Sequence, residues 1–291
     1  MQKGKLLIIA DMENRCYATP RGLALAASLQ QDADVVAFTY APLKRLKMKG
    51  PEQTAIRKRL IRERESAVQA RIDKYTRSGQ KVGLKAVWAK DIHSWIAKQC
   101  AGDKYTAVVK TGNRSESLLH TPTDWRLLRE CPVPVMLVCD EKWSDTQPVL
   151  ATLDLSTSVA SKRRLNHKVL GNALWLSQAL GVELQVVSAI EVPTLLADLD
   201  LVDPGTYARE AREDMEAEIR KLSDLFDLPA SVFTCKRGPV EKVITSHAAK
   251  IRAQIVVMGT VGRTGVKAAL MGNTAENVLR HLKTDVFAIK P

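Results

Sequence analysis

Three glycines near the C-terminal end of the chain have a spacing that suits an anion-binding loop. Gly259, Gly262 and Gly272 form the pattern G-x2-G-x9-G, which begins just after the apolar run Ile255 to Met258. Glycine permits positive φ angles and a close approach of the backbone, so the N–H groups of Gly259 and Gly262 can face an anion. The position of this loop directly after a sheet strand favours binding over a simple turn of the chain.

A second phosphate-facing segment follows in the same stretch. Gly272, Asn273 and Thr274 open an expected helix that runs toward Lys283, and Asn273 or Thr274 can cap it. The N-terminus of a helix has unpaired N–H groups that bind phosphate readily. The loop and the helix together therefore predict a phosphate site.

The chain carries its pattern of elements twice, with a period of about 145 to 150 residues. Each half begins with an apolar strand that ends in an aspartate, Asp11 in the first half and Asp154 in the second. Helix-like amphipathic stretches separate the strand-like runs. The expected strands are Leu6 to Ala10, Val35 to Tyr40, Val82 to Trp88, Ala107 to Lys110, Val135 to Val138, Val149 to Leu153, Leu184 to Ile190, Ser231 to Lys236, Ile255 to Met258 and Val286 to Ile289.

Runs rich in Val, Ile and Leu are typical of strands buried on both faces, and connections long enough for a helix permit parallel pairing. The predicted fold class is α/β, with two tandem Rossmann-like domains, each a five-stranded parallel sheet flanked by helices. The expected domains are 1–141 and 148–291, joined by the polar segment Asp140 to Pro148. Ligands of such sheets bind at the carboxyl ends of the strands, which directs attention to the residues just after the first, second and fourth strands of each half.

The motifs MGTVGRTG and GNTAEN in the second half and TPTDW in the first resemble those of the universal stress protein family, in its tandem-domain type. The resemblance covers both halves, and hence nearly the whole chain. It implies a Rossmann-like fold of five parallel strands. From the family's nucleotide-binding branch it also implies ATP or a related adenine nucleotide, with or without Mg, in the second domain.

The resemblance further implies which residues form the site. Asp154, next to Leu153, would lie near the ribose or the adenine, the backbone near Ala189 would contact adenine, and Met258 would flank the base. The residues expected around ribose and phosphates are Gly259, Gly262, Arg263, Gly272, Asn273 and Thr274. Asn273 departs from that branch, which has Ser or Thr there, although an amide can still donate to a phosphate oxygen.

The corresponding stretch of the first half, VVKTGNRSESLLHTPTDW, is three residues shorter and has Gly112 as its one glycine. Pro122, expected in the first turn of the following helix, has no N–H to donate. Lys110 and Arg114 can hold an anion there only through their side chains. We therefore interpret the first half as a degenerate copy without a phosphate cradle.

The net charge of +12 is concentrated in the first half, where residues 1–150 carry 26 Lys and Arg against 16 Asp and Glu. Residues 44–64 contain nine basic side chains and two acidic ones, Glu52 and Glu63. Such a segment attracts polyanions, including nucleic acid. No aromatic residue is interleaved for base stacking, which favours a solvated helix face with a loop over a nucleic-acid site.

Five cysteines without a C-x-x-C pair do not form a disulfide framework. A zinc site of Cys131, Cys139 and His120 has no standard spacing, which favours ordinary buried thiols. The five histidines fall in separate places, which favours surface or capping roles over catalysis. With neither a membrane helix nor a secretory signal in the sequence, we expect a cytoplasmic protein.

The function that the sequence predicts is stress-related sensing or signalling through nucleotide binding, without fast catalysis. Slow ATP hydrolysis, an enzyme of the same α/β class, and polyanion binding by residues 44–64 are the alternatives. We also expect the two halves to pack as an intramolecular pseudo-dimer through their last strands, VPVMLV and DVFAIK.

Overall fold

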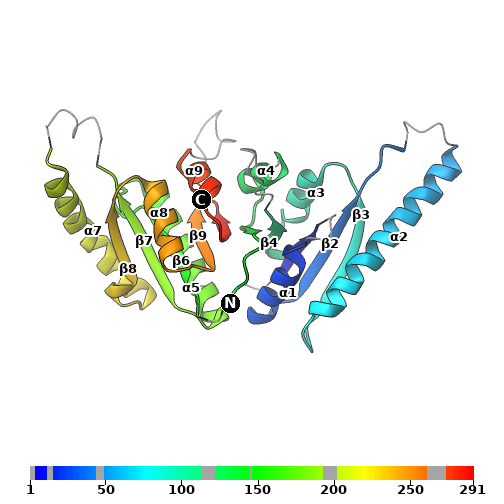
Figure 1. The fold of residues 1–291 in the computed structure, drawn as a ribbon, viewed down its shortest axis with the longest axis horizontal. Helices are drawn as coiled ribbons and strands as arrows, with labels where there is room; N and C mark the ends of the chain where they lie inside the picture. Colours follow the sequence, from blue (N-terminus) through cyan, green and yellow to red (C-terminus); the bar gives the residue numbers. More distant parts are fainter. Residues whose placement is uncertain are drawn as a thin grey trace. The chain divides into compact units, whose positions relative to one another are not determined.

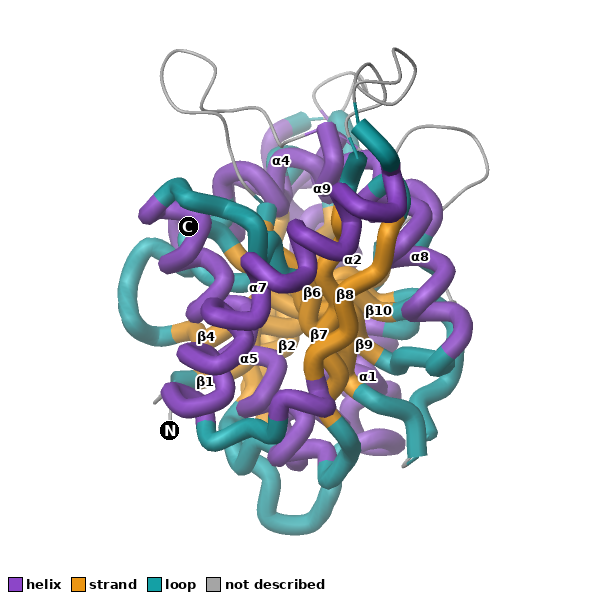
Figure 2. The backbone as a smooth tube through the Cα atoms, turned by 90° about the vertical axis from the view of Figure 1, so that its left-hand side faces the viewer, coloured by secondary structure: helices purple, strands orange, loops and turns teal. Residues whose placement is uncertain are grey.

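A computed structural model describes residues 4–11, 16–43, 49–112, 122–144, 146–192, 202–260 and 273–291. The chain divides into two compact units, Met1–Asp140 and Glu141–Pro291. Each unit is drawn in Figures 1 and 2 as a central sheet with helices on its faces.

The first unit contains a parallel sheet in the order β3-β2-β1-β4-β5. Right-handed crossovers in this order place α1 and α2 on one face of the sheet and α3 and α4 on the other. The central strand is fully buried at Leu6, Leu7 and Ile8, as expected for a strand covered on both faces. The elements are β1 (Lys5–Ala10), α1 (Ala18–Ser28), β2 (Ala33–Thr39), α2 (Gly50–Tyr75), β3 (Val82–Trp88), α3 (Ile92–Gln99), β4 (Tyr105–Thr111), α4 (Pro122–Glu130) and β5 (Val135–Val138).

The second unit repeats this plan, with its parallel strands in the order β10-β9-β6-β7-β8. Helices α5 and α7 pack on β7, and α8 packs on both β7 and α9. The elements are β6 (Val149–Thr152), α5 (Ala160–Leu180), β7 (Leu184–Ile190), α7 (Pro204–Phe226), a 3-10 turn (Ala230–Val232), β8 (Phe233–Arg237), α8 (Val240–Lys250), β9 (Ile255–Gly259), α9 (Asn273–His281) and β10 (Asp285–Ile289).

The predicted fold class is confirmed, and each of the ten predicted strands begins and ends within two residues of its observed bounds. Helix α7 begins at Pro204, because Asp203 caps it by accepting a hydrogen bond from the Thr206 N–H at 2.7 Å. Pro204 and Gly205 therefore belong to its first turn. The pairing of the last strands of the two halves stays a prediction.

The histidine prediction was wrong for two of the five residues. His93 is buried with its Nε2 3.0 Å from the Glu130 carboxylate, and His247 is buried with its Nδ1 2.6 Å from Lys236 Nζ. Burial first, and then the charges of Lys236 and Lys250, lower the pKa of His247. Both imidazoles therefore belong to the packing of their units.

The cysteines are buried thiols at four positions, and Cys235 is half-buried. Within the described ranges, no three His, Cys, Asp or Glu side chains gather as a metal site would require, and His120 lies outside those ranges. None of the described helices combines the length and the apolar character needed to cross a membrane.

Candidate functional site

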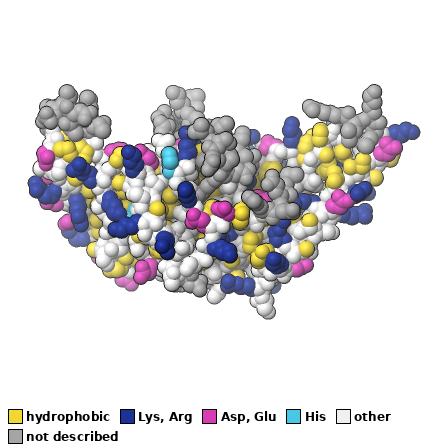
Figure 3. Space-filling model, viewed as in Figure 1, with side chains coloured by type: hydrophobic (Ala, Val, Ile, Leu, Met, Phe, Trp, Pro, Cys, Tyr) yellow, Lys and Arg dark blue, Asp and Glu magenta, His cyan; other side chains and the backbone are white. Residues whose placement is uncertain are grey.

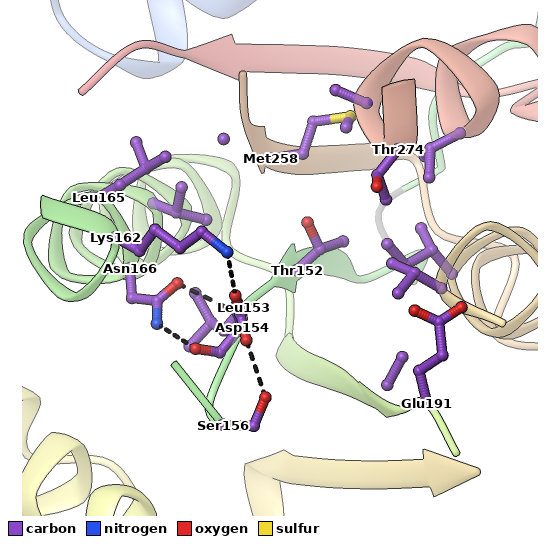
Figure 4. Close-up of a pocket in the computed structure, with 17 residues that line it drawn as sticks. Thr152, Leu153, Asp154, Ser156, Lys162, Leu165, Asn166, Glu191, Met258 and Thr274 are labelled. Atoms are coloured by element: carbon purple, nitrogen blue, oxygen red, sulfur yellow. Dashed lines mark hydrogen bonds and ion pairs between the residues drawn. The ribbon is translucent and has the colours of Figure 1, made fainter. Parts of the chain in front are cut away.

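The second unit has a cavity of about 590 Å³ at the carboxyl ends of β6, β7 and β9 (Figure 4). Helices α5, α8 and α9 supply the rest of its wall. A volume of this size lies within the range of small-molecule sites. Its lining residues are Thr152, Leu153, Asp154, Ser156, Lys162, Leu165, Asn166, Val169, Ala189, Glu191, Val240, Ile244, Met258, Gly259, Thr274, Ala275 and Val278.

Asp154 is at the centre of the polar wall. It follows β6, and its carboxylate accepts a hydrogen bond from Ser156 Oγ at 3.0 Å and lies 3.1 Å from Lys162 Nζ (Figure 4). The Asp154 and Lys162 side chains remain 44% and 43% exposed. Both groups are therefore open to a ligand that enters the cavity.

Asn166 fixes the backbone that carries Asp154. Its Oδ1 accepts from the Asp154 N–H at 3.2 Å, and its Nδ2 donates to the Asp154 carbonyl at 2.8 Å. The side chain is buried, so both bonds are shielded from water. Helix α5 thus supplies both the cation that pairs with Asp154 and the amide that holds its backbone in place.

Gly259, the last residue of β9, is required by the close approach of α5. A Cβ built on Gly259 would lie 2.6 Å from Cδ2 and 2.9 Å from Cγ of Leu165. The sequence predicts an anion-facing loop at this glycine, and the structure shows that it has a packing role as well. Gly259 and Leu165 both line the cavity, so their contact shapes its wall.

The opposite wall of the cavity is apolar. Val240 and Ile244 lie one turn apart on α8, Val278 comes from α9, and Met258 from β9. Met258 and Val278 are buried, which fixes this surface in place. The cavity therefore combines an apolar wall that suits a flat ring with a polar wall that suits hydroxyl or phosphate groups.

Six of the ten residues predicted for the site line this one cavity: Leu153, Asp154, Ala189, Met258, Gly259 and Thr274. Asn273 begins α9 next to Thr274. Gly262, Arg263 and Gly272 lie outside the described residues.

Sequence reasoning missed Lys162, Asn166 and Glu191. Lys162 and Asn166 are spaced i, i+4 on α5, so they share the helix face that carries the apolar Leu165 and Val169. An asparagine among these buried apolar positions was the available signal, because a buried amide requires partners. Glu191 directly follows β7, and ligands of such sheets bind at the carboxyl ends of the strands, so its position was the available signal.

The equivalent region of the first unit is occupied by its own side chains. Thr111 ends β4, and its hydroxyl donates to the Asp11 carboxylate while accepting from the N–H groups of Tyr17 and Ala18, at 3.2 and 2.9 Å. Arg64 of α2 donates to the carbonyls of Ala10 and Asp11. The placement of Arg64 on a solvated helix face was therefore wrong.

Lys110 also differs from the prediction that it can hold an anion. It is buried, with its Nζ 2.7 Å from the fully buried Asp124 carboxylate and 2.8 Å from the Thr111 carbonyl oxygen. A cation that is neutralised inside the protein is not available to a phosphate. Arg114 lies outside the described residues.

Universal stress protein E of Escherichia coli (strain K12) is 32% identical to this chain over 246 residues, which cover 82% of the chain and 78% of that protein. The chain belongs to the universal stress protein family. The sequence model of the family, described as "Universal stress protein family", matches residues 161–290.

Two further universal stress proteins match over nearly the full length of the chain. The Universal stress protein E homolog of Haemophilus influenzae is 27% identical, and the alignment covers 99% of this chain and 97% of the homolog. The crystal structure of a universal stress protein from Archaeoglobus fulgidus DSM 4304 superposes with a TM-score of 0.65 at 19% identity, covering 100% of this chain and 99% of that one. The latter similarity supports the fold.

Proposed function

We propose that this universal stress protein binds ATP or a related adenine nucleotide in the cavity of its second unit. The observation that carries the proposal is that six residues implied by the family resemblance line a single cavity at the carboxyl ends of β6, β7 and β9. In an α/β sheet, ligands bind at this edge of the strands. The first unit has no part in this proposal, because Thr111, Arg64 and Lys110 engage the equivalent groups.

The two walls of the cavity suggest how a nucleotide is held. Adenine lies against Met258 and the apolar side chains of α8, and the backbone near Ala189 contacts its edge. The ribose hydroxyls reach the Asp154 carboxylate, which accepts hydrogen bonds. Lys162 and Thr274 interact with phosphate, together with the N-terminus of α9. The predicted contributions of Gly262, Arg263 and Gly272 belong to the same proposal.

The biological role that we propose is sensing or signalling in the stress response, in which the bound nucleotide shifts conformation or partner affinity. Binding is favoured over fast catalysis because the described lining residues contain no Ser, Cys or Thr nucleophile paired with a histidine base. If the cavity holds Mg with the nucleotide, the carboxylates of Asp154 and Glu191 are the oxygen ligands available among the described lining residues. The cytoplasmic location stays a prediction.

Calorimetric titration with ATP, ADP, AMP and GTP tests the proposal. We expect one site per chain, with adenine nucleotides bound more tightly than GTP. An Asp154→Asn variant keeps the shape of the side chain but loses its charge. It should weaken the binding of nucleosides and of nucleotides by about tenfold, the effect expected when a charge-assisted hydrogen bond is lost. If no nucleotide binds the folded protein, the proposal fails.

A further inference from the structure

The first unit has a groove at the carboxyl ends of β2 and β3, next to but distinct from the pair β1 and β4, where ligands of such sheets usually bind. It encloses about 610 Å³ beside the first turns of α2. In the space-filling view, hydrophobic side chains gather beside α2, and both basic and acidic side chains lie around them (Figure 3). The lining residues are Tyr40, Ala41, Pro42, Leu43, Gly50, Gln53, Thr54, Arg57, Trp88 and Lys90.

Two aromatic rings form the floor of this groove. The register of β2 and β3 pairs Thr39 with Trp88, which brings the next residue, Tyr40, against the indole. The two ring centroids are 5.7 Å apart with an interplanar angle of 53°. Tyr40 is 43% exposed, which is unusual for a large aromatic side chain and leaves its ring available for stacking.

A guanidinium group covers the same aromatic floor. The Cζ atom of Arg57 lies 5.6 Å from the centroid of the Trp88 ring, within cation–π distance. Arg57 is exposed, so its planar group can also accept a stacked base on its free side. This arrangement is not visible in the sequence, because Tyr40 and Trp88 lie outside residues 44–64 and only the sheet brings them to the basic helix.

The charge of the groove is positive. Arg57 and Lys90 line it, and none of its described lining residues is acidic. Both acids of residues 44–64 are engaged elsewhere, since Glu52 Oε2 accepts from the Lys49 N–H at 3.0 Å and Glu63 pairs with Arg59 at 2.7 Å. The exposed Lys58 and Arg62 continue the basic surface along α2.

We propose that this groove binds single-stranded nucleic acid, with a base stacked on Tyr40 and Arg57. The backbone phosphates are held by Arg57 and Lys90 in the groove and by Lys58 and Arg62 along α2. Stacking platforms combined with a cationic track are the means by which proteins hold single strands without strong sequence preference. A mononucleotide phosphate would use one or two cations, whereas the basic surface continues well past the groove. A single-stranded nucleic acid, with its row of phosphates, therefore matches this basic surface better than a mononucleotide does.

The test is fluorescence anisotropy of a labelled 12-nucleotide oligothymidine with the full chain. Tyr40→Ala and Arg57→Ala should each weaken binding by about tenfold, since loss of one stacked base typically has an effect of that order. Tyr40→Phe should retain most of the affinity, because the ring remains.

Two matched controls lie on α2 outside the groove. Tyr75 is 41% exposed and has Lys74 Nζ 5.3 Å from its ring centroid, so Tyr75→Ala removes a similar aromatic. Arg59→Ala removes the same charge as Arg57→Ala. Each control should change the affinity by less than about twofold at physiological salt. At low salt, Arg59→Ala should also show the general loss of affinity that follows from removing one positive charge.

Several results would overturn the proposal. Equal losses for Arg57→Ala and Arg59→Ala, together with unchanged binding by Tyr40→Ala, would mean that α2 attracts any polyanion without a stacking site. Duplex DNA or heparin bound as tightly as the single strand would mean the same. If thymidine monophosphate competes with the same affinity as the oligomer, the groove is a mononucleotide pocket. If the oligomer does not bind even at low salt, the proposal is wrong.

Discussion

Each unit places an aspartate just beyond its first strand, but the surroundings of the two side chains differ. The registers pair Ile8 with Val109 and Ala151 with Val257, so Asp11 and Asp154 occupy equivalent positions. Asp154 borders a cavity of about 590 Å³. Asp11 is engaged by the Thr111 hydroxyl, and its carbonyl by Arg64. The same strand-end pattern therefore supports an open site in one unit and internal hydrogen bonds in the other.

One position explains much of this difference. By the same registers, Thr111 and Gly259 are equivalent, and each ends the fourth strand of its sheet. The Thr111 hydroxyl joins the N-terminus of α1 to Asp11, whereas Gly259 has no side chain and leaves room for Leu165. The threonine thus ties Asp11 to its own unit, whereas the glycine makes no contact with Asp154 of that kind, so a retained aspartate does not by itself indicate a retained site.

The first helices of the two units differ in a related way. Gly22 in α1 accommodates Ile8 of β1, where an added Cβ would meet Ile8 Cγ1 at 2.7 Å. In the second unit the helix carries Leu165, and the strand residue Gly259 makes the space. The glycine needed for close helix–strand packing thus lies on the helix in one unit and on the strand that borders the cavity in the other.

The largest expected effect concerns the two lysine–aspartate pairs. Lys110→Met should destabilise the protein by about 3–5 kcal/mol, because it removes the ammonium group that lies 2.7 Å from the fully buried Asp124 carboxylate. Lys162→Met should lower the unfolding free energy by less than about 1 kcal/mol, because its partner Asp154 is 44% exposed. Urea denaturation of both variants measures the difference in unfolding free energy, and similar losses would contradict the contrast between a buried and an open strand end.

The next largest effect comes from exchanging the residue that ends the fourth strand. Gly259→Thr should lower the unfolding free energy by about 1–3 kcal/mol, since its Cβ collides with Leu165. It should also weaken adenine nucleotide binding by at least about tenfold, because Leu165, which the new side chain displaces, lines the cavity. Denaturation and calorimetric titration measure these two effects.

Leu165→Ala provides the control for that exchange. Because it removes the atoms that collide, the loss of stability in the double variant should be smaller than the sum of the two single losses. Additive losses would mean that the contact between Gly259 and Leu165 does not limit this position.

Asn166→Leu tests the amide that holds the Asp154 backbone. Leu23 follows Asp11 at the same sequence distance as Asn166 follows Asp154, and it is fully buried. Loss of two hydrogen bonds should reduce the unfolding free energy by about 1–2 kcal/mol and weaken nucleotide binding. Asn172→Leu on the same helix is the control, because Asn172 Nδ2 donates to the Lys168 carbonyl within α5; an equal effect there would assign the loss to the helix alone.

The smallest effect is a dependence on pH that belongs to the first unit. Burial raises the pKa of Asp34, but hydrogen bonds from Lys104, Tyr105 and Lys5 outweigh it and hold the pKa below its usual value of 3.8. The equivalent position in β7 is the neutral Gln185. A depressed folded pKa stabilises the protein above pH 3.8, and this contribution is lost as the pH falls through the folded pKa.

Asp34→Asn should therefore lower the unfolding free energy by about 1 kcal/mol near neutral pH and change it little at about pH 3. Urea denaturation across this range measures the loss. Gln185→Ala should show no such acid dependence. If the difference between Asp34→Asn and the unchanged protein is the same at both pH values, the carboxylate does not contribute in its charged form.

The strands could be predicted because burial on both faces demands continuous apolar runs, as at Leu6 to Ala10. Asp154 and Gly259 could be chosen because ligands of such sheets bind at the carboxyl ends of the strands, and the sequence shows where each strand stops. The sequence marks Asn166 as a buried amide, but the contacts of Asn166 and Lys162 with Asp154 could not be predicted, since they depend on how α5 lies against β6. Arg64 reaches Asp11 across 53 residues of sequence, and the meeting of Tyr40 with Trp88 depends on the register of two strands. Contacts set by register and helix placement are not encoded in local spacing.

Photolabelling of the full chain with 8-azido-ATP, followed by mass spectrometry of the labelled peptides, tests the contrast between the two units most directly. We expect one label per chain, located within residues 149–291 on peptides that contain Ala189 or Met258, and competed by excess ATP. Gly259→Thr should reduce this labelling sharply. Competed labelling on peptides of residues 4–140 at equal yield would contradict the account, because it would place a working nucleotide site where Thr111, Arg64 and Lys110 occupy the strand ends.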